Sequence, residues 1–306
     1  MRVTEIFPRR KTLSLELFPP KSELGMQKLD QELERLYALE PDYISCTYGA
    51  GGKGLGKHME LLCRLSSDAK TIPMTHFTCI GSGKEYIRHQ LQSYLDIGVD
   101  HILALRGDLP NGWSGTRGDL QYASELVSFI REAFGDRFTI AVAGSPEGHI
   151  ECKSIESDIE FLKHKQDCGA DFILTQLCWD MEQFERWLEK IRAAGITMPV
   201  DVGIMPILDQ AATINMALSR NACVLPRKLC ELITRHWIFP NPFDKNPYDE
   251  EAETKKLSFR KAGIEYTIEQ IEQFKKMDVS GFHLYALNRY DDVAYIAQQA
   301  GLLERN

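Results

Sequence analysis

The chain has 306 residues, of which 43% are hydrophobic and 26% charged, and its formal net charge is −8. This length is enough for one large α/β barrel, and the acidic balance argues against a general nucleic-acid binder, which would carry a basic surface. No apolar run approaches the roughly 20 residues of a membrane-spanning helix, and residues 1–10 lack the apolar core of a secretory signal. We therefore expect one domain over residues 1–306, cytoplasmic, with no nucleic-acid or membrane partner.

Short apolar runs alternate with amphipathic segments along the chain. The predicted strands cover residues 13–18, 43–48, 73–79, 101–106, 138–143, 172–178, 200–205 and 282–287. Helical periodicity lies between them, as in Leu29, Leu33 and Leu36. Eight alternating strand and helix units predict a closed (β/α)8 TIM barrel of the α/β class rather than a doubly wound open sheet.

The segment 211–279 interrupts this regular alternation because it is too long for one helix. Pro226 and Pro247 divide it, and its last part has an apolar helical face formed by Ile264, Ile268 and Ile271. We expect a helical insertion between the seventh and eighth strands, folded over one end of the barrel.

The eight cysteines contain no Cys-x-x-Cys pair. Three of them, Cys46, Cys79 and Cys178, fall inside predicted strands, where cysteine behaves as a small buried hydrophobic residue. We expect the whole set to be structural, and we predict no metal site.

Two carboxylates stand near the ends of predicted strands. Glu16 shares one strand face with Ser14 and Phe18, and Asp108 follows the fourth strand. Since the carboxyl ends of the strands build the functional face of such a barrel, both are candidate catalytic residues. The alternatives are structural: Glu16 capping a loop amide, and Asp108 forming a turn after Gly107.

Other polar residues gather at predicted strand ends, among them Thr47, His76, Arg106, Gln176 and Arg289. They include amide, hydroxyl and guanidinium groups but no nucleophile paired with a base. Such a set suits hydrogen bonding to a flat polar heterocycle and a phosphate better than hydrolysis.

The segments that carry these residues resemble the methylenetetrahydrofolate reductase family in its compact bacterial form. The resemblance runs from about residue 12 to residue 300. Its motifs are Leu-Glu-Leu-Phe-Pro-Pro at 15–20, Ser-Cys-Thr-Tyr-Gly-Ala at 45–50, Thr-His-Phe-Thr-Cys at 75–79, Leu-Ala-Leu-Arg-Gly-Asp-Leu-Pro at 103–110, Thr-Gln at 175–176 and Phe-His-Leu-Tyr-Ala-Leu-Asn-Arg at 282–289.

The resemblance implies a barrel that binds FAD at the carboxyl ends of its strands. A hydride would pass from NADH or NADPH to FAD and then to 5,10-methylenetetrahydrofolate, giving 5-methyltetrahydrofolate in a ping-pong sequence. The implied FAD-binding residues are Thr47, Tyr48, Ala50, His76, Arg106, Gly107, Asp108, Tyr122, Ala123, Ser145, His149, Asp158 and Lys165. The implied folate-site residues are Glu16, Asp108, Gln176 and Arg289.

Two roles follow from the same resemblance. Glu16 would give a proton to N10 of the folate, opening the one-carbon bridge so that it accepts hydride. This requires a carboxyl that is protonated near neutral pH, and we expect apolar neighbours such as Phe18 to raise its pKa by desolvation. Asp108 would lie beside the flavin and the pterin and would pair with the pterin N–H groups. Arg106 and Lys165 would suit the pyrophosphate of FAD, and Asp158 a ribose hydroxyl.

The chain also departs from the family pattern. Ala212 and Met216 stand where a glutamine and a phenylalanine are expected, Ser145 replaces a tyrosine, and Gln210 is a candidate to supply the missing amide. Two other interpretations stay open, a catalytically silent flavoprotein scaffold subunit and an FAD barrel of the proline-dehydrogenase type. The sequence also leaves open the choice between NADH and NADPH, the direction of the reaction, a homo-oligomer and an additional electron-delivering subunit.

Overall fold

Eight parallel strands close into a barrel in the computed structural model, which describes residues 1–20, 22–47, 55–110, 112–219, 223–237, 250–286 and 289–304. The strands are β1 (Thr12–Leu17), β2 (Tyr43–Cys46), β3 (Ile72–Thr78), β4 (His101–Leu105), β5 (Thr139–Gly144), β6 (Phe172–Thr175), β7 (Val200–Ile204) and β8 (Gly281–Tyr285). They pair in chain order and β8 pairs with β1, which confirms the predicted (β/α)8 barrel.

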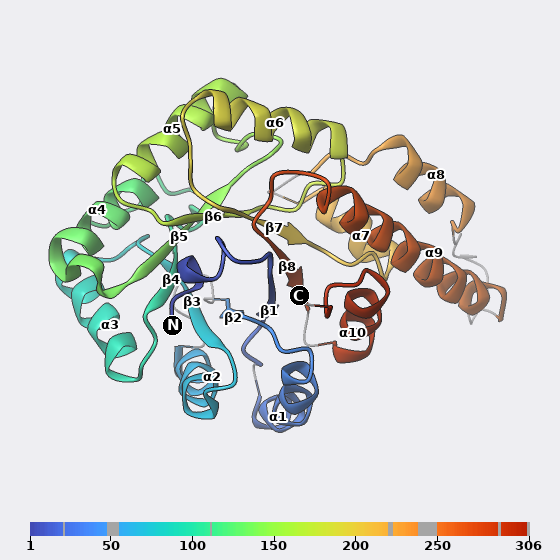
Figure 1. The fold of residues 1–306 in the computed structure, drawn as a ribbon, viewed down its shortest axis with the longest axis horizontal. Helices are drawn as coiled ribbons and strands as arrows, with labels where there is room; N and C mark the ends of the chain where they lie inside the picture. Colours follow the sequence, from blue (N-terminus) through green and yellow to red (C-terminus); the bar gives the residue numbers. More distant parts are fainter. Residues whose placement is uncertain are drawn as a thin grey trace.

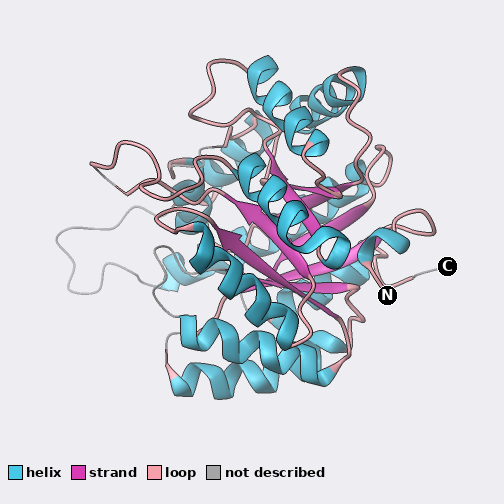
Figure 2. Cartoon of the chain, turned by 90° about the vertical axis from the view of Figure 1, so that its left-hand side faces the viewer, coloured by secondary structure: helices cyan, strands magenta, loops and turns pink. Residues whose placement is uncertain are grey.

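Helices form a ring around the strands (Figure 1), and the view turned by 90° shows the strands enclosed between them (Figure 2). The helices are α1 (Glu23–Tyr37), α2 (Leu55–Asp68), α3 (Lys84–Asp96), α4 (Ala123–Phe134), α5 (Ile155–Asp167), α6 (Met181–Ala193), α7 (Gln210–Ala217), α8 (Arg227–Arg235), α9 (Glu250–Phe274) and α10 (Tyr290–Gln299). Two 3-10 turns add to them, η1 (Val3–Glu5) and η3 (Gly135–Arg137).

The alternation of β1 divides its side chains between two environments. Leu13, Leu15 and Leu17 are buried in the apolar layer between strands and helices. Burial of each leucine contributes about 1.5–3 kcal/mol, which fixes the register of the strand against α1 and its neighbours. Ser14 and Glu16 consequently face the barrel interior.

The end of the barrel where the strands begin is filled by apolar side chains. The ring of Phe7, which follows η1, lies 5.2 Å from the ring of Phe172 on β6. Tyr43 on β2 meets the same ring edge-on at 6.2 Å. This packing fills the interior at that end.

The described part of the segment between β7 and β8 contains three helices, α7, α8 and α9. Among them, α9 packs against both α6 and α10 and so takes the regular barrel position. A second apolar cluster joins α8 and α9 to the segments that follow β6 and β7, with Trp179, Ile207, Leu229 and Phe259 among its members. Pro247, which we expected to divide this segment, lies outside the described residues.

Several predicted strands were too long. β6 ends at Thr175 rather than Cys178, and β2 ends at Cys46. Cys46, Cys79 and Cys178 are buried as expected, and so is Cys223, whereas Cys230 is exposed. Within the described ranges, no helix is both long and apolar enough to cross a membrane.

Candidate active site at the carboxyl ends of the strands

Glu16 lies inside the barrel near the end of β1, with 12% of its side chain exposed. Its Oε2 is 3.4 Å from Nε2 of His283 on β8 and 3.6 Å from Nε2 of His76 on β3. These partners belong to strands on either side of β1, so the carboxyl group points into the interior and not toward the helices. An alternating strand predicts this orientation.

The expected protonation of Glu16 was wrong in direction. Burial raises the pKa of its carboxyl, but the charge of His76, the hydrogen bond with His283 and the charge of His283 together lower it, and the net pKa is below the ordinary value. Phe18 does not supply the expected apolar cover because it is 43% exposed. Glu16 is therefore a carboxylate at neutral pH in this state.

Two serine hydroxyls complete the contacts of the histidines. Oγ of Ser14 lies 2.8 Å from Nδ1 of His283. Oγ of Ser45 lies 3.2 Å from Nε2 of His76 and 3.4 Å from Nε2 of His283. The His283 imidazole is fully buried and stacks on the Tyr43 ring, with centroids 5.6 Å apart and planes inclined by 14°. One connected polar group thus surrounds Glu16.

We did not predict a role for His283, Ser45 or Tyr43. The available signal was the period of two in β8, where Gly281, His283 and Tyr285 alternate with the outward-facing Phe282 and Leu284. A histidine flanked by buried apolar residues faces the barrel interior in the same way as Glu16. That inference needed the register between β8 and β1, which pairs Ser14 with His283.

The loop after β4 carries the second candidate acid. Asp108 is exposed, and in the described part of the chain no hydrogen bond joins it to Glu16. Gly107 has φ of +90°, and a Cβ there would lie 2.6 Å from Cγ2 of Ile80, so this position requires glycine. Arg106 donates two hydrogen bonds to Glu151, at 2.5 and 3.0 Å. The guanidinium predicted to bind the pyrophosphate is therefore already paired with a carboxylate.

The residues expected around FAD on β5 and α5 lie close together. Nζ of Lys165 donates to the carbonyl oxygen of Ala143 at 3.0 Å, and burial lowers the pKa of its ammonium, with Asp158 opposing that effect. Asp158 accepts from Sγ of Cys152 at 3.4 Å. His149 is exposed, and its Nδ1 accepts from the backbone N–H of Glu151 at 3.2 Å.

The remaining predicted residues occupy strand or helix ends. Thr47 follows β2, Gln176 follows β6 and is exposed, Ser145 follows β5, Tyr122 and Ala123 begin α4, and Arg289 precedes α10. Tyr48 and Ala50 lie outside the described residues. The predicted positions thus gather at the carboxyl ends of the strands, apart from Asp158 and Lys165 on α5.

Two of the residues that depart from the family pattern, Ala212 and Met216, belong to α7. Ala212 is exposed, and Met216 packs against the second apolar cluster. The Nε2 amide of Gln210 donates to the carbonyl oxygen of Ile233 on α8 at 2.9 Å. Since this hydrogen bond ties α7 to α8, Gln210 does not present its amide to the barrel in the way we considered.

The chemistry of this donor set fits a flavin dinucleotide. The ammonium of Lys165 now has a neutral carbonyl oxygen as its partner, and a phosphate would supply a negatively charged one. The carboxylate of Asp158 can accept a hydrogen bond from a ribose hydroxyl. Both lie on α5, and the hydrogen bond of Lys165 places its Nζ beside Ala143 near the end of β5. A phosphate bound by Arg106 would have to compete with the pairing of its guanidinium with Glu151.

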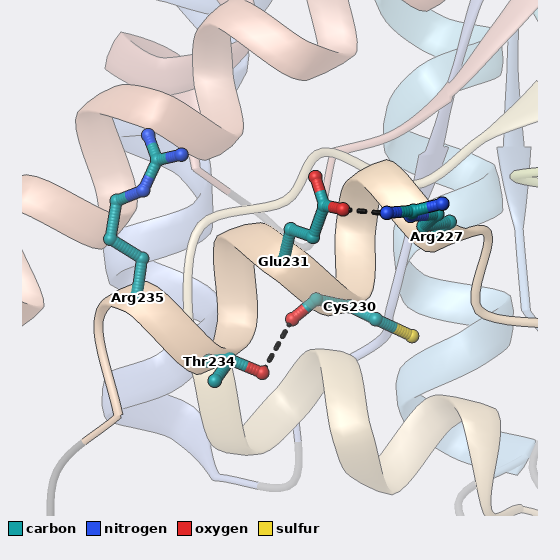
Figure 3. A pocket seen from close by; sticks show the side chains of 5 residues that line it. All are labelled: Arg227, Cys230, Glu231, Thr234 and Arg235. Carbon is teal, nitrogen blue, oxygen red and sulfur yellow. Dashed lines mark hydrogen bonds and ion pairs between the residues drawn. The ribbon is translucent and has the colours of Figure 1, made fainter.

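A separate surface hollow of about 450 Å³ lies on α8 (Figure 3), lined by Arg227, Cys230, Glu231, Thr234 and Arg235. Three of these side chains make hydrogen bonds within the helix. Arg227 donates to Glu231 at 2.9 Å, and the hydroxyl of Thr234 donates to the carbonyl oxygen of Cys230 at 2.8 Å. Neither a catalytic group nor a strand end contributes to it, so the strand ends remain the candidate site.

Comparison with known proteins gives a consistent result. The sequence model of the family described as methylenetetrahydrofolate reductase matches residues 3–301. The 5,10-methylenetetrahydrofolate reductase of Escherichia coli (strain K12) is 32% identical over 277 residues, covering 90% of this chain and 86% of that protein. Methylenetetrahydrofolate reductase 1 of Schizosaccharomyces pombe is 32% identical over 298 residues, covering 96% of this chain but 47% of that protein.

The chain therefore spans about half the length of its fission yeast relative and 49% of the Arabidopsis thaliana methylenetetrahydrofolate reductase (NADH) 1. Among solved structures, a Clostridium thermocellum protein described as binding two copies of 5-methyl-5,6,7,8-tetrahydrofolic acid has a TM-score of 0.62 at 13% identity, with 99% of both chains covered. A Xanthomonas albilineans dihydropteroate synthase has a TM-score of 0.52 at 11% identity, covering 97% of this chain and 92% of that one. At these identities the two structures show a shared fold.

Proposed function

The chain belongs to the methylenetetrahydrofolate reductase family, and on that basis we propose that it reduces 5,10-methylenetetrahydrofolate to 5-methyltetrahydrofolate. The proposal includes FAD as the hydride carrier, NADH or NADPH as the electron donor, and a ping-pong order in which both substrates use one flavin. The FAD ring, when bound, accepts hydride from the nicotinamide and donates it to the folate.

One observation of this molecule carries the proposal. The carboxyl group of Glu16 lies inside the barrel near the carboxyl end of β1 and shares Oε2 with two imidazoles, those of His76 and His283. A folate bridge opens only when N10 is protonated, which demands a proton donor held against the ligand. Glu16 and its two histidine neighbours form a group that can hold and donate a proton. This group lies at the end of the barrel opposite the apolar packing of Phe7 and Phe172.

Other residues of the chain would bind and orient the ligands. Asp108, exposed on the loop after β4, can accept hydrogen bonds from the pterin amino and ring N–H groups. Gln176 at the end of β6 offers an amide to the pterin or the nicotinamide. Arg289 precedes α10 and suits the carboxylates of the folate glutamate.

The low pKa of Glu16 sets a condition on this chemistry. An ionised carboxylate cannot donate a proton, so the site must deliver one to Oε2 before the bridge opens. The two imidazoles that lower the pKa of Glu16, those of His76 and His283, are also the groups that can hold this proton. The proposal therefore needs His76 or His283 in addition to Glu16.

The deciding experiment separates the two half-reactions under anaerobic conditions. We expect purified protein to be yellow, to lose its flavin absorbance on addition of NADH or NADPH, and to regain it on addition of 5,10-methylenetetrahydrofolate. Glu16→Gln should keep the first step within about twofold and slow the second by about 10²–10⁴-fold, the usual contribution of a general acid. The exposed residue Glu85 on α3 gives a matched control, Glu85→Gln, which should leave both steps unchanged.

Each alternative predicts a different result. A silent flavoprotein scaffold would retain its colour yet fail to reoxidise with the folate. A proline-dehydrogenase-type barrel would be bleached by proline and not by a reduced nicotinamide. Equal slowing of both half-reactions in Glu16→Gln would contradict the role given to Glu16, and a colourless protein with no affinity for FAD would contradict the proposed function as a whole.

A further inference from the structure

His283 has the contacts of a proton carrier for Glu16. Its imidazole has no exposed surface, and its two ring nitrogens face different partners. Nε2 is 3.4 Å from Oε2 of Glu16, and Nδ1 is 2.8 Å from Oγ of Ser14. Since 12% of the Glu16 side chain is exposed, the carboxyl group connects the buried imidazole with the open end of the barrel.

We propose that His283 is the positioning residue of Glu16: the imidazole holds a proton on Nε2 and delivers it to Oε2, and Glu16 then gives this proton to N10 of the folate. The inference rests on the proposed function and deepens it. In this step the Nε2–H bond of the imidazolium breaks and an O–H bond forms on Oε2 of Glu16. That O–H bond then breaks as an N–H bond forms at N10, which leaves a carboxylate and a neutral imidazole. The neutral imidazole regains a proton from water through Glu16 after the product leaves.

Hydrogen bonding at Nδ1 keeps the imidazole in the required orientation. The hydroxyl of Ser14 is also 3.4 Å from the carbonyl oxygen of Phe282, so it can donate there and accept from Nδ1–H. This arrangement leaves Nε2 as the nitrogen that gains or loses the proton facing Glu16. His283 and Glu16 then exist either as an imidazolium and a carboxylate, with the proton on Nε2, or as a neutral imidazole and a carboxylic acid, with the proton on Oε2.

The groups that face His283 come from the strands on both sides of β8 and from β2. Glu16 on β1 lies on one side, and on β7 the carboxylate of Asp201 interacts with the charge of His283. The Tyr43 ring on β2 stacks on the imidazole, and the Tyr285 phenol lies edge-on at 5.8 Å. These two rings are neutral at pH 7, because burial raises the pKa of both phenols.

His76 on β3 is the other candidate, and its surroundings oppose charging. Burial lowers the pKa of its imidazole, Glu16 opposes that effect, and the charge of His283 lowers the pKa further. At 3.6 Å it is also the more distant of the two from Oε2. Burial and the longer distance to Oε2 therefore make His76 the less suitable of the two imidazoles for carrying the proton.

The first test follows the proton without a substrate. We would record histidine side-chain ¹⁵N signals of the purified protein between pH 5 and 9 and identify His283 by its loss in His283→Gln. Glu16→Gln should lower the titration midpoint of this signal by about 1–3 pH units, because it removes an opposite charge within 4 Å. The exposed residue His89 gives the control His89→Gln, which should remove a different signal and leave the His283 midpoint in place. An identical midpoint with and without the Glu16 carboxylate would overturn the proposal.

The second test uses the two half-reactions. His283→Gln places an amide near Nε2 that still donates to Glu16 but cannot release a proton. Flavin reduction by the nicotinamide should stay within about twofold, whereas reoxidation by the folate should slow at least about tenfold and lose its pH dependence between pH 6 and 8. Ser14→Ala, which keeps the imidazole, should slow the same step less and shift its pH profile.

A wild-type rate and pH profile in His283→Gln would show that the hydrogen bond alone suffices and would overturn the proton-carrying role. If His283→Gln does not fold, Ser14→Ala and the Glu16→Gln titration decide the question. If wild-type protein fails to reoxidise with the folate, the proposed function fails. The ¹⁵N titration then still establishes whether Glu16 and His283 share a proton.

Discussion

The hydroxyl of Tyr43 donates a hydrogen bond of 2.7 Å to Oδ2 of Asp201, a carboxylate with no exposed surface. Thr12 donates to the same oxygen at 3.1 Å, whereas Oδ1 has no hydrogen-bond partner in the described part of the chain. Burial raises the pKa of Asp201 to about 6, although His283, Tyr43 and Thr12 oppose that effect. A buried carboxylate with one unpartnered oxygen makes the stability of the barrel depend on pH.

We expect Asp201 to destabilise the fold as the pH rises from about 4 to about 6. In this window the folded protein retains a proton on Asp201 that the unfolded chain has released, so the favourable contribution is present at low pH and is lost as the pH passes 6. A shift from 3.8 to about 6 corresponds to about 3 kcal/mol. We would measure the free energy of unfolding in urea for wild type and Asp201→Asn from pH 4 to pH 7.5. Over this range the stability of the variant relative to wild type should rise by about this amount.

The exposed residue Asp30 on α1 provides the control for this series. Asp30→Asn should shift the unfolding free energy by a nearly constant amount at every pH, because its carboxyl is solvated in both states. A constant difference for Asp201→Asn as well would mean that Asp201 titrates like a solvated carboxyl and would contradict the prediction.

The barrel and the inward orientation of Glu16 could be predicted from the sequence because both depend on local periodicity. The alternation of Leu13, Leu15 and Leu17 determines which face of β1 is buried under the helices, and Glu16 must then face inward. Register between distant strands has no comparable local signal. Only the closed barrel brings His76 on β3 and His283 on β8 beside Glu16, and these two neighbours together reverse the expected pKa shift of the carboxyl.

The orientations and partners of loop residues could not be predicted from local sequence periodicity either. The direction of Phe18 depends on the turn that follows β1, and the pairing of Arg106 with Glu151 joins two loops from different strand ends. The family resemblance, together with the chemistry of a guanidinium, suggested Arg106 as a phosphate ligand. It gave no indication that a carboxylate of the chain already occupies the guanidinium.

The close approach of α9 to the segment after β7 depends on Gly263. A Cβ at this position would lie 2.1 Å from the carbonyl oxygen of Ile207. Alanine is intrinsically better than glycine inside a helix by about 0.5–1 kcal/mol, but overpacking against rigid backbone costs about 1–3 kcal/mol. We expect Gly263→Ala to lower the free energy of unfolding by about 1–2 kcal/mol, as measured in urea.

A matched glycine in α2 separates packing from helix propensity. Nothing lies within 4 Å of a Cβ built on Gly56. Gly56→Ala should therefore leave stability unchanged or raise it slightly. Equal effects of the two substitutions would show that α9 can move away from Ile207 without cost.

Asp108 should matter more for the folate than for the flavin. Asp108→Asn removes the negative charge that would pair with the pterin N–H groups, a type of hydrogen bond that contributes about 1.5–3 kcal/mol. We expect the rate of flavin reoxidation at low folate concentration to fall about 10–100-fold, while the bound flavin per protein, measured from the visible spectrum, stays near one. Loss of the flavin with no separate effect on reoxidation would instead support a turn-forming role after Gly107.

The pairing of Arg106 with Glu151 predicts a competition for the guanidinium. Arg106 is 20% exposed and Glu151 36%, so water screens the ion pair and its own contribution to stability is at most about 1 kcal/mol. If Arg106 binds the FAD pyrophosphate, Glu151→Gln should free it and tighten FAD binding by a few-fold, whereas Arg106→Gln should weaken binding about tenfold or more. Titration of the flavin-free protein with FAD, followed by flavin fluorescence, measures both effects. Weaker binding in both variants would show that the intact ion pair shapes the loop, and Arg106 would then not contact the phosphate.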